Sequence, residues 1–485
     1  MKKVISCILA AAMIAMAVAM TSCEEKPAVT GKNTGTAPVT GTVTGAADPD
    51  PWPTADLSGK TLKIFGREDT SWKTKPDILP ETEVEDDVIS SEITTRNQWL
   101  KDNYGFDIEF TGTTDADWLN TAKAELQAGT AGYNLFIGNG SNLAALSKEN
   151  ALVDLASHDT INLDREWWDQ CSIRDLSIAG KVFFLTGSLS TSDIDCTYAL
   201  YFNKAAAEEN NIENPYQLVY DNKWTLDKLL EICKDVRVDT NDDGKWTDVD
   251  NYGYLCENYD SYAMFFGSGE TVVKKNAEDL PEFSLETTRA ADVVEAMKNY
   301  YTADGVFVNY AATITPMFQK RQSVFCGTIL MKARTVFRQM DDDFGVLPLP
   351  KYESSQENYV SAVSSGTSGS LVGIPTSCDD VDSAVLMLEL FTRKSHDTLR
   401  KGYYDVVVTK QSVRDEDSVK MLDIILGSRV FDAAYIYSWG GWFTWLYNIA
   451  GNPSGANIAS QISAQKDKTL TDIQDTVDAF KSFIG

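Results

Sequence analysis

The sequence predicts an α/β protein whose globular body contains more than one domain. Three observations lead to this prediction: short apolar runs alternate with amphipathic helical segments, the chain has 485 residues, and 43% of the residues are hydrophobic. The body begins near residue 57 and has roughly 430 residues, which is enough to bury a substantial core in two or more domains.

The first part of the body predicts a βαβαβ unit. Strands are expected at 62–66, 107–110 and 133–137, and helices at 90–104 and 117–128, where apolar residues recur at helical spacing. Strands joined by helices pair in parallel, and ligands of such sheets bind at the carboxyl edge. Asn139 and Ser141, which directly follow the third strand, are therefore candidate ligand contacts. The third glycine of a dinucleotide-binding loop is missing here.

The next part of the chain contains several motifs in a defined order. Tyr-Phe-Asn-Lys at 201–204 ends an expected strand, and Trp-Thr-Leu-Asp-Lys at 224–228 begins an expected amphipathic helix. Later elements are expected as a strand at 318–326, a return hinge at 343–351, a strand at 372–375 and a helix at 382–393. In this order the motifs resemble those of bacterial extracellular solute-binding proteins that serve ABC importers, especially the carbohydrate-binding class. The resemblance spans most of residues 60–485.

The resemblance implies a two-lobed periplasmic-binding-protein-like fold. Each lobe would be a mostly parallel sheet flanked by helices, and hinge segments near 186–198, 346–350 and 393–403 would join the lobes and let them close around a ligand. The expected domains are a signal peptide at 1–22, a lipid-anchored flexible linker at 23–56, lobe 1 at 57–192 with 350–398, and lobe 2 at 193–349 with 399–485.

The resemblance also implies a binding function without enzymatic activity. A monomer would capture a monosaccharide or oligosaccharide between its lobes and deliver it to the permease of an ABC importer. Two alternatives stay open, a secreted glycoside hydrolase, which needs only two carboxylates, and a glycan-binding adhesin. The sequence contains no HExxH or GxSxG motif, and we interpret its two histidines, His158 and His396, as surface or capping residues.

Aromatic and polar residues are the candidate ligand contacts, because sugars present apolar C–H faces and a rim of hydroxyls. Trp439 and Trp442 lie in an aromatic-rich stretch near the C-terminus. Maltodextrin-binding relatives take a stacking ring from a comparable stretch, and this resemblance makes both tryptophans candidate platforms. The alternative is that they pack beneath the last helices. Further polar candidates are Asp193 and Asp195 at the expected inter-lobe crossing, and Arg334 after an expected strand at 325–331.

The N-terminus predicts export and anchoring. Two lysines precede an apolar run at 4–20, which is short for a membrane-spanning helix and typical of a signal peptide. Met-Thr-Ser-Cys at 20–23 resembles the bacterial lipobox, which implies that Cys23 carries lipid and holds the protein at the outer face of the cell membrane. The alternative is an ordinary cleaved signal in which Cys23 is incidental. The Thr-, Gly- and Pro-rich residues that follow predict a flexible tether.

A calcium-binding loop is predicted at 239–250. Side chains with oxygen atoms occupy loop positions 1, 3, 5 and 12 and a glycine occupies position 6, as in the oxygen-rich loops that bind Ca²⁺. The candidate ligands are Asp239, Asn241, Asp243, Asp250 and the backbone carbonyl of Lys245. Asp at position 12, where Glu is usual, resembles dockerin-type loops. We expect a structural ion, and the alternative is a solvated acidic turn.

The overall charge narrows the range of partners. The formal net charge is −28, so the surface repels phosphate backbones and anionic lipid headgroups, and we expect no nucleic acid and no polybasic membrane contact. A neutral or cationic small ligand is favoured. Six of the eight cysteines lie in the body without a CxxC pair, and the simplest interpretation is buried free thiols.

Overall fold

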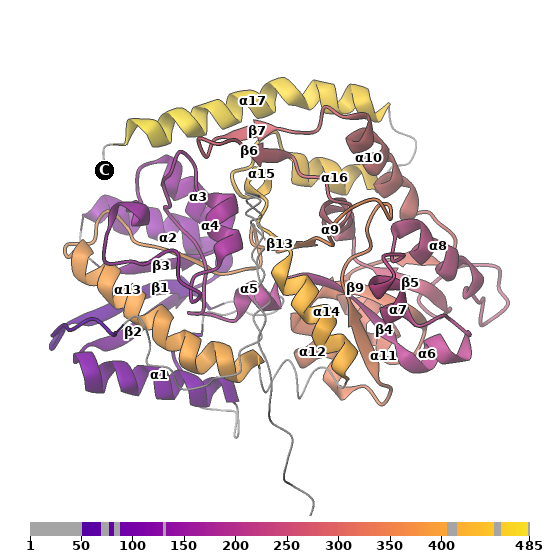
Figure 1. The fold of residues 1–485 in the computed structure, drawn as a ribbon, viewed down its shortest axis with the longest axis horizontal. Coiled ribbons are helices and arrows are strands. Elements are labelled where there is room, and N and C mark those ends of the chain that lie inside the picture. The colour runs from indigo at the N-terminus through magenta and orange to yellow at the C-terminus, as the bar shows by residue number, and fades with distance from the viewer. Residues whose placement is uncertain are drawn as a thin grey trace, which may run out of the picture. The chain divides into compact units, whose positions relative to one another are not determined.

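The computed structural model describes residues 51–68, 77–81, 88–129, 132–404, 415–450 and 457–483. Trp52–Gly485 form one compact unit, whose two main sheets are seen in Figure 1. The predicted signal peptide, Cys23 and the linker up to residue 50 lie outside the described residues.

The first lobe is built on a four-stranded sheet with the strand order β12-β3-β1-β2. β1 pairs in parallel with both β2 and β3, and β12 is antiparallel to β3. The strands are β1 (Thr61–Arg67), β2 (Asp107–Thr113), β3 (Leu135–Gly138) and β12 (Leu371–Gly373). The helices are α1 (Val88–Tyr104), α2 (Asp115–Ala128), α3 (Gly140–Lys148), η1 (Leu155–Ser157), α4 (Gln170–Leu176), α13 (Val381–Ser395) and η3 (His396–Arg400).

The second lobe is built on a five-stranded mixed sheet with the order β10-β4-β9-β5-β8. β5 is parallel to β8 and β9, whereas β4 is antiparallel to β9 and β10. The strands are β4 (Tyr198–Asn203), β5 (Tyr252–Cys256), β8 (Val306–Val308), β9 (Ser323–Ile329) and β10 (Phe344–Leu347). The helices are α6 (Lys204–Glu209), α7 (Pro215–Tyr220), α8 (Leu226–Asp235), α9 (Asp260–Gly267), α10 (Thr288–Tyr300), α11 (Ala311–Gln319), α12 (Met331–Thr335), η2 (Phe337–Gln339) and α14 (Glu416–Gly427).

Most of the predicted elements are confirmed, because local patterns specify them. Trp-Thr-Leu-Asp-Lys does begin α8: the side chain of Thr225 accepts a hydrogen bond from the backbone N–H of Lys228 and so caps the helix. The strand predicted at 318–326 is wrong in its first half. Phe318 lies in the last turn of helix α11, which ends at Gln319, and the strand begins at Ser323 after a turn at Arg321, whose φ is 62°.

Two segments that connect the lobes lie wholly within the described residues. The first contains the short helix α5 (Ser192–Asp195), and the second is the return segment, residues 348–370, which runs from β10 to β12. Within the return segment, β11 (Ser361–Ala362) pairs in parallel with β13 (Arg429–Val430). These crossings agree with the predicted hinge positions at 186–198 and 346–350.

The C-terminal segment contacts both lobes, although we expected all of residues 399–485 in the second lobe. It contains α15 (Ala433–Ile436), α16 (Trp442–Ala450) and α17 (Ile458–Ser482). α15 packs against α3 of the first lobe, α16 against α9 and α10 of the second, and α17 against both α3 and α10. Figure 1 shows α17 lying across both lobes, beside the hairpin of β6 (Val273–Lys275) and β7 (Pro281–Phe283).

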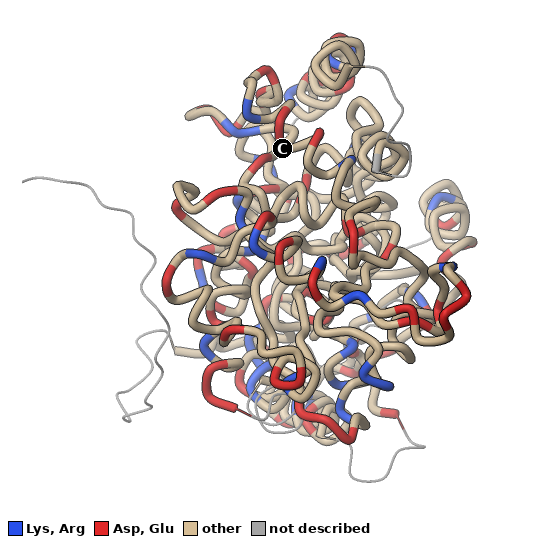
Figure 2. Tube along the Cα trace, turned by 90° about the vertical axis from the view of Figure 1, so that its right-hand side faces the viewer, with Lys and Arg blue, Asp and Glu red and all other residues tan. Residues whose placement is uncertain are grey.

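The cysteines and the charged residues of the body are distributed as the composition predicts. All six cysteines of the body are free, as predicted, and five of them are buried. None of the helices within the described residues is both long and apolar enough to cross a membrane. Figure 2 shows Asp and Glu spread over loops and helices with Lys and Arg among them, so the negative charge is distributed over the body.

Candidate functional site

The carboxyl edge of the first sheet brings together three polar side chains. Arg67 ends β1, Asp115 follows β2, and Asn139 follows β3. The guanidinium group of Arg67 donates to the carboxylate of Asp115 at 3.0 Å, and the amide of Asn139 donates to the same carboxylate oxygen at 3.3 Å. Because the strands are parallel, residues that directly follow each strand meet at one edge, as the sequence predicted for Asn139.

The amino end of α3 at this edge is occupied by the protein's own backbone. The N–H of Gly140 donates to the carbonyl of Ser365 at 2.8 Å, and the N–H of Ser141 donates to the carbonyl of Gly366 at 3.2 Å. The side chain of Asn139 caps the helix by accepting from the N–H of Asn142. The first two backbone donors of α3, which include that of the candidate contact Ser141, therefore hold the return segment.

The corresponding edge of the second sheet presents a carboxylate and exposed tyrosines. Glu257 follows β5 and accepts a hydrogen bond from the hydroxyl of Thr328 at 2.8 Å. Burial raises the pKa of Glu257, and the Thr328 bond and the charge of Lys332 act in the opposite direction. Tyr259 and Tyr310, which lie just beyond β5 and β8, are 40% and 60% exposed.

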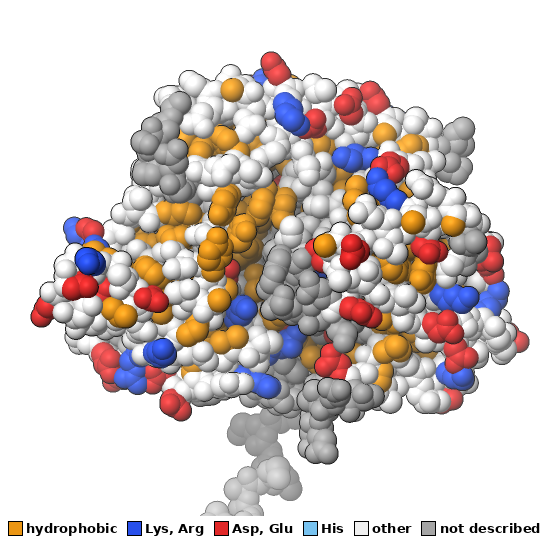
Figure 3. All heavy atoms as spheres, turned by 180° about the vertical axis from the view of Figure 1, so that it is seen from behind, with side chains coloured by type: hydrophobic (Ala, Val, Ile, Leu, Met, Phe, Trp, Pro, Cys, Tyr) orange, Lys and Arg blue, Asp and Glu red, His pale blue; other side chains and the backbone are white. Residues whose placement is uncertain are grey.

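Four aromatic side chains form a stacked group, the aromatic row, which starts at this edge. Tyr435 and Phe443 stack with ring centroids 4.0 Å apart, Phe443 and Tyr259 are 5.9 Å apart, and Tyr259 and Tyr447 are 5.2 Å apart. The rings come from α9's preceding loop, α15 and α16. On the face of the molecule shown in Figure 3, hydrophobic side chains gather near the middle. Such rings provide flat apolar surface, and tyrosine adds a hydroxyl for hydrogen bonding.

The return segment connects the two edges. Its residue Val363 forms a bridge with Thr197, just before β4 of the second sheet, while its carbonyls at 365 and 366 accept from α3 of the first lobe. The hydroxyl of Tyr435 donates to Thr367 at 3.1 Å. The polar edge of the first lobe and the aromatic row therefore lie on either side of one short stretch of chain.

The two tryptophans predicted as platforms are buried. Trp439 and Trp442 are each 1% exposed. Their indole N–H groups donate to the hydroxyls of Thr476 and Thr469 on α17, at 2.9 and 2.8 Å. Both rings pack against α17, although the Trp439 ring also forms part of the lining of a groove of about 570 Å³ together with Phe266 and Phe431. We take the aromatic row as the candidate platform, because its Tyr259 ring is exposed at the carboxyl edge.

The predicted polar contacts at the inter-lobe crossing are engaged in buried ion pairs. Asp195 is 0% exposed and accepts both bonds of a bidentate pair from Arg334, at 3.0 and 2.6 Å. Asp193 accepts from Arg400 and Arg429, both at 2.8 Å. Although burial acts to raise it, the pKa of Asp193 is held below its ordinary value by these two guanidinium groups. These side chains join α5 to α12, η3 and β13 around the crossing, and ligand contact by them stays a prediction.

The predicted calcium loop is folded as a tight acidic turn. The carboxylate of Asp250 accepts from the backbone N–H groups of Thr240 and Thr247, and these bonds lower its pKa. Gly244, at loop position 6, has a φ of 71°, which glycine adopts without strain. Among the described residues, no three His, Cys, Asp or Glu side chains lie close enough together to hold a metal ion.

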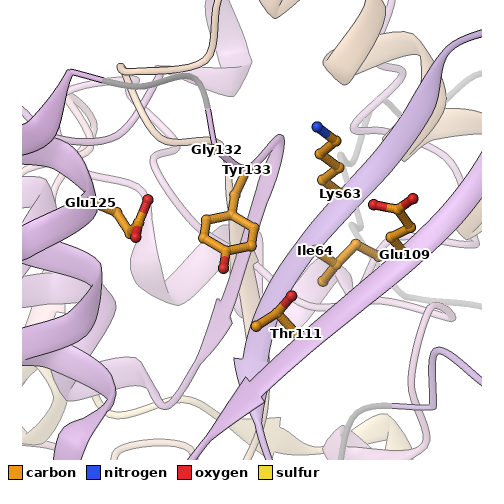
Figure 4. Close-up of a pocket in the computed structure, with 7 residues that line it drawn as sticks. All are labelled: Lys63, Ile64, Glu109, Thr111, Glu125, Gly132 and Tyr133. Carbon is orange, nitrogen blue, oxygen red and sulfur yellow. The ribbon is translucent and has the colours of Figure 1, made fainter.

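A groove of about 250 Å³ lies against β1 and β2 of the first sheet, away from the polar side chains described above. Figure 4 shows Tyr133 between Glu125 of α2 and the strands that carry Ile64 and Thr111. Tyr133 precedes β3, whereas Ile64 and Thr111 lie within β1 and β2, so this groove lies along the strands and not beyond their carboxyl ends. It is therefore separate from the carboxyl edge, where ligands of parallel sheets usually bind.

Glu257, Tyr259, Tyr310, Phe443 and Tyr447 were not among the candidate site residues predicted from sequence. A local signal was present for the first two, because Glu-Asn-Tyr-Asp at 257–260 follows an apolar run, as Asn139 follows its strand. The stacking of Phe443 on Tyr435 had no such signal, since it depends on how α15 and α16 pack.

Comparisons with known proteins identify the family. The model of a family described as bacterial extracellular solute-binding protein matches residues 96–421, which is more than half of the chain. No curated protein matches the sequence significantly.

Three solved structures of similar fold are distant in sequence. A cyclo/maltodextrin-binding protein in complex with maltotetraose has 13% identity over 86% of this chain and 99% of its own, with a TM-score of 0.58. An extracellular solute-binding protein from Staphylococcus aureus with maltose has 14% identity over 86% and 98%, with a TM-score of 0.57. A cyclic α-maltosyl-1,6-maltose-binding protein from Arthrobacter globiformis has 12% identity over 86% and 99%, with a TM-score of 0.56. At such identities the likeness shows the two-lobed fold.

Proposed function

We propose that this chain, which belongs to the bacterial extracellular solute-binding protein family, captures a carbohydrate between its lobes for an ABC importer. The family implies a location outside the cytoplasm. One observation carries the choice of ligand: the aromatic row, with its exposed Tyr259, lies beside the polar groups Glu257 and Thr328 at the carboxyl edge of the second sheet. This combination suits a sugar, which offers an apolar face to a ring and hydroxyls to hydrogen-bonding groups.

The ligands of the similar structures support the same choice. The three structures of similar fold contain or are named for maltotetraose, maltose and a cyclic maltosyl saccharide. A glucose-based oligosaccharide is therefore the first ligand to test.

Capture would proceed by closure of the lobes over the ligand. A ligand that contacts both sheet edges gains more contacts in a closed form than in an open one, and so shifts the population toward closure. Converting a population of about 1% closed into about 99% requires roughly 10⁴-fold tighter binding to the closed form. The protein itself would carry out no reaction on the sugar, and an importer permease would receive it.

Calorimetry with maltodextrins, cellodextrins and short peptides, combined with small-angle scattering, tests this function. We expect saturable binding of one saccharide class and a smaller radius of gyration in its presence. Binding of peptides alone would overturn the choice of ligand. Release of shortened sugar products would instead establish the hydrolase alternative, and saccharide binding with no compaction would favour an adhesin.

Anchoring through a lipid on Cys23 is a second part of the proposal. Its support is the sequence at 20–23, and its benefit is a raised effective concentration of the receptor beside its importer. Replacing Cys23 by Ser should release the protein from the membrane fraction and leave saccharide affinity unchanged. Retention of the variant in the membrane fraction would contradict the anchor.

Calcium binding by the loop at 239–250 is proposed as a structural feature. Its support is the buried Oδ1 of Asp239, which has no hydrogen-bond partner, together with the turn at Gly244. Asp239, Asn241, Asp243, Asp250 and the carbonyl of Lys245 would hold the ion. The carboxylates would have to approach one another, so the expected sign of binding is a higher melting temperature with calcium than with chelator. Equal melting temperatures would contradict calcium binding by this loop.

A further inference from the structure

Arg67 makes an unusual number of hydrogen bonds to one short stretch of chain. Its side chain is 0% exposed at the end of β1. Besides its bond to Asp115, the guanidinium group donates to three consecutive carbonyls of the return segment, those of Thr367 at 2.9 Å, Ser368 at 2.7 Å and Gly369 at 2.9 Å, and to the hydroxyl of Ser370 at 3.3 Å.

This set of bonds fixes the backbone of the return segment. Three successive carbonyls can point at one group only in a tight, defined conformation, and the planar guanidinium offers donors in a rigid arrangement that a lysine cannot reproduce. The N–H groups of Gly140 and Ser141 hold the preceding carbonyls at 365 and 366. The return segment is thus attached to the carboxyl edge of the first sheet through every residue from 365 to 370.

The same segment contacts the aromatic row. The hydroxyl of Thr367 accepts the hydrogen bond of Tyr435, and Tyr435 stacks on Phe443 with an interplanar angle of 9°. In addition, a Cβ on Gly366 would lie 2.4 Å from the ring of Tyr435, so the ring lies directly against the backbone here. The position of the return segment therefore determines where the first ring of the row lies.

We propose that Arg67 is a positioning residue for ligand binding. It holds Thr367 in the place that orients Tyr435, and through Tyr435 it orients Phe443 and Tyr259 on the second lobe. This role rests on the proposed function, because the aromatic row is the surface on which the saccharide would lie. It also couples the first sheet to the platform of the second lobe without direct contact of Arg67 with the ligand.

Three variants of the full chain test the proposal, with maltotetraose as the probe. Arg67→Lys keeps the charge but loses most of the bonds, and should weaken binding about tenfold, while Tyr435→Phe should weaken it about threefold. If Arg67 acts through Tyr435, the double variant should bind like Arg67→Lys alone, within about twofold. Arg67→Lys should also change the near-ultraviolet circular dichroism of the tyrosines, and adding Arg67→Lys to Tyr435→Phe should change that spectrum little further.

Arg96→Lys is the matched control, because Arg96 is also 0% exposed in the first lobe but donates to the carbonyl of Ile78 and the hydroxyl of Ser395. It should lower the melting temperature and leave the tyrosine spectrum and the affinity unchanged. Additive losses in the double variant, or an Arg67→Lys spectrum like that of the control, would overturn the proposal.

The experiment also covers two other results, misfolding of Arg67→Lys and a wild type that binds no saccharide. If Arg67→Lys does not fold, Thr367→Val, which keeps the carbonyl and removes the hydroxyl, should match Tyr435→Phe, and wild-type affinity in that variant would overturn the connection. If the wild type does not bind maltotetraose or any other saccharide, the proposed function fails. The spectra of the ligand-free variants still decide whether Arg67 positions the aromatic row.

Discussion

Two groups of aromatic residues in the C-terminal half differ in what they contact. Trp439 and Trp442 are 1% exposed beneath α17, with each indole N–H bonded to a threonine of that helix. Tyr259, in contrast, is 40% exposed and stacks between Phe443 and Tyr447 at the carboxyl edge of the second sheet. Large rings from the same part of the chain can therefore belong either to the core or to the candidate ligand platform. The difference is whether a helix such as α17 packs over them.

Replacing Trp442 with Ala should give the largest effect on stability. Removal of a fully buried indole leaves a cavity and takes away one of the two hydrogen bonds of the Thr469 hydroxyl, which still donates to the carbonyl of Gln465. The free energy of unfolding should therefore fall by about 3–5 kcal/mol. Saccharide affinity of the folded fraction should stay within about twofold of wild type. Urea denaturation and calorimetry measure the two quantities. A stable variant that no longer binds would reverse the assignment of Trp442 to the core.

Replacing Asp195 with Ala should have the next largest effect. Loss of Asp195 leaves the partly buried guanidinium group of Arg334 and the buried hydroxyl of Tyr403 without their shared carboxylate, so the free energy of unfolding should fall by about 3 kcal/mol. The double variant Asp195→Leu with Arg334→Met should recover more than half of this loss, since it removes both charges. If the double variant is stable but has lost saccharide affinity, the pair belongs to the ligand site as well as to the crossing.

Replacing Tyr259 with Ala should affect binding and leave folding nearly unchanged. The ring is partly exposed, so we expect less than about 1 kcal/mol in stability but at least a tenfold weaker saccharide affinity, equal to about 1.4 kcal/mol. Tyr220 is the matched control, because it is 45% exposed on α7 and lies outside the aromatic row. Equal effects of the two substitutions on affinity would remove Tyr259 from the platform.

The pH dependence of stability tests the buried carboxyl group at the start of α15, the helix that carries Tyr435 of the aromatic row. Burial raises the pKa of Asp432, which caps α15 just before Tyr435, from 3.8 to about 7. Between these values the folded protein keeps a proton that the unfolded chain has lost, so the free energy of unfolding should fall as the pH rises from about 4 to about 7.

Denaturation of the wild type and of Asp432→Asn at several pH values between about 4 and about 8 measures this contribution. The variant should show a smaller decrease over that range, because its amide does not titrate. The same decrease in both proteins would mean that another group is responsible.

Much of the fold could be predicted because local patterns specify it. Helical spacing and the cap at Thr225 defined α8, and short apolar runs defined β1, β2 and β4. The motif order also predicted the family that the comparisons identify. The start of β9 was misplaced because Phe318 belongs to an apolar helix, whose residues fit a buried strand equally well by periodicity.

The sequence predicted that polar residues would lie at the carboxyl edge of the first sheet, but it identified only some of the residues that lie there. Asn139 was placed at the carboxyl edge because it follows a parallel strand, and the structure has it there. The role of Arg67 had no signal in the sequence, since its partners at 367–370 are about 300 residues away. Asp195 and Arg334 were both noted, but their mutual pairing depends on how α5 meets α12.

The sequence by itself determined the elements, the family and the abundance of aromatic residues near the C-terminus, because each of these depends on neighbours along the chain. Only the tertiary structure decided which rings face outward. That choice depends on α17, which covers Trp439 and Trp442, and on the return segment, which holds Tyr435 through Thr367. A ring's exposure is set by what packs against it, and those partners come from distant parts of the chain.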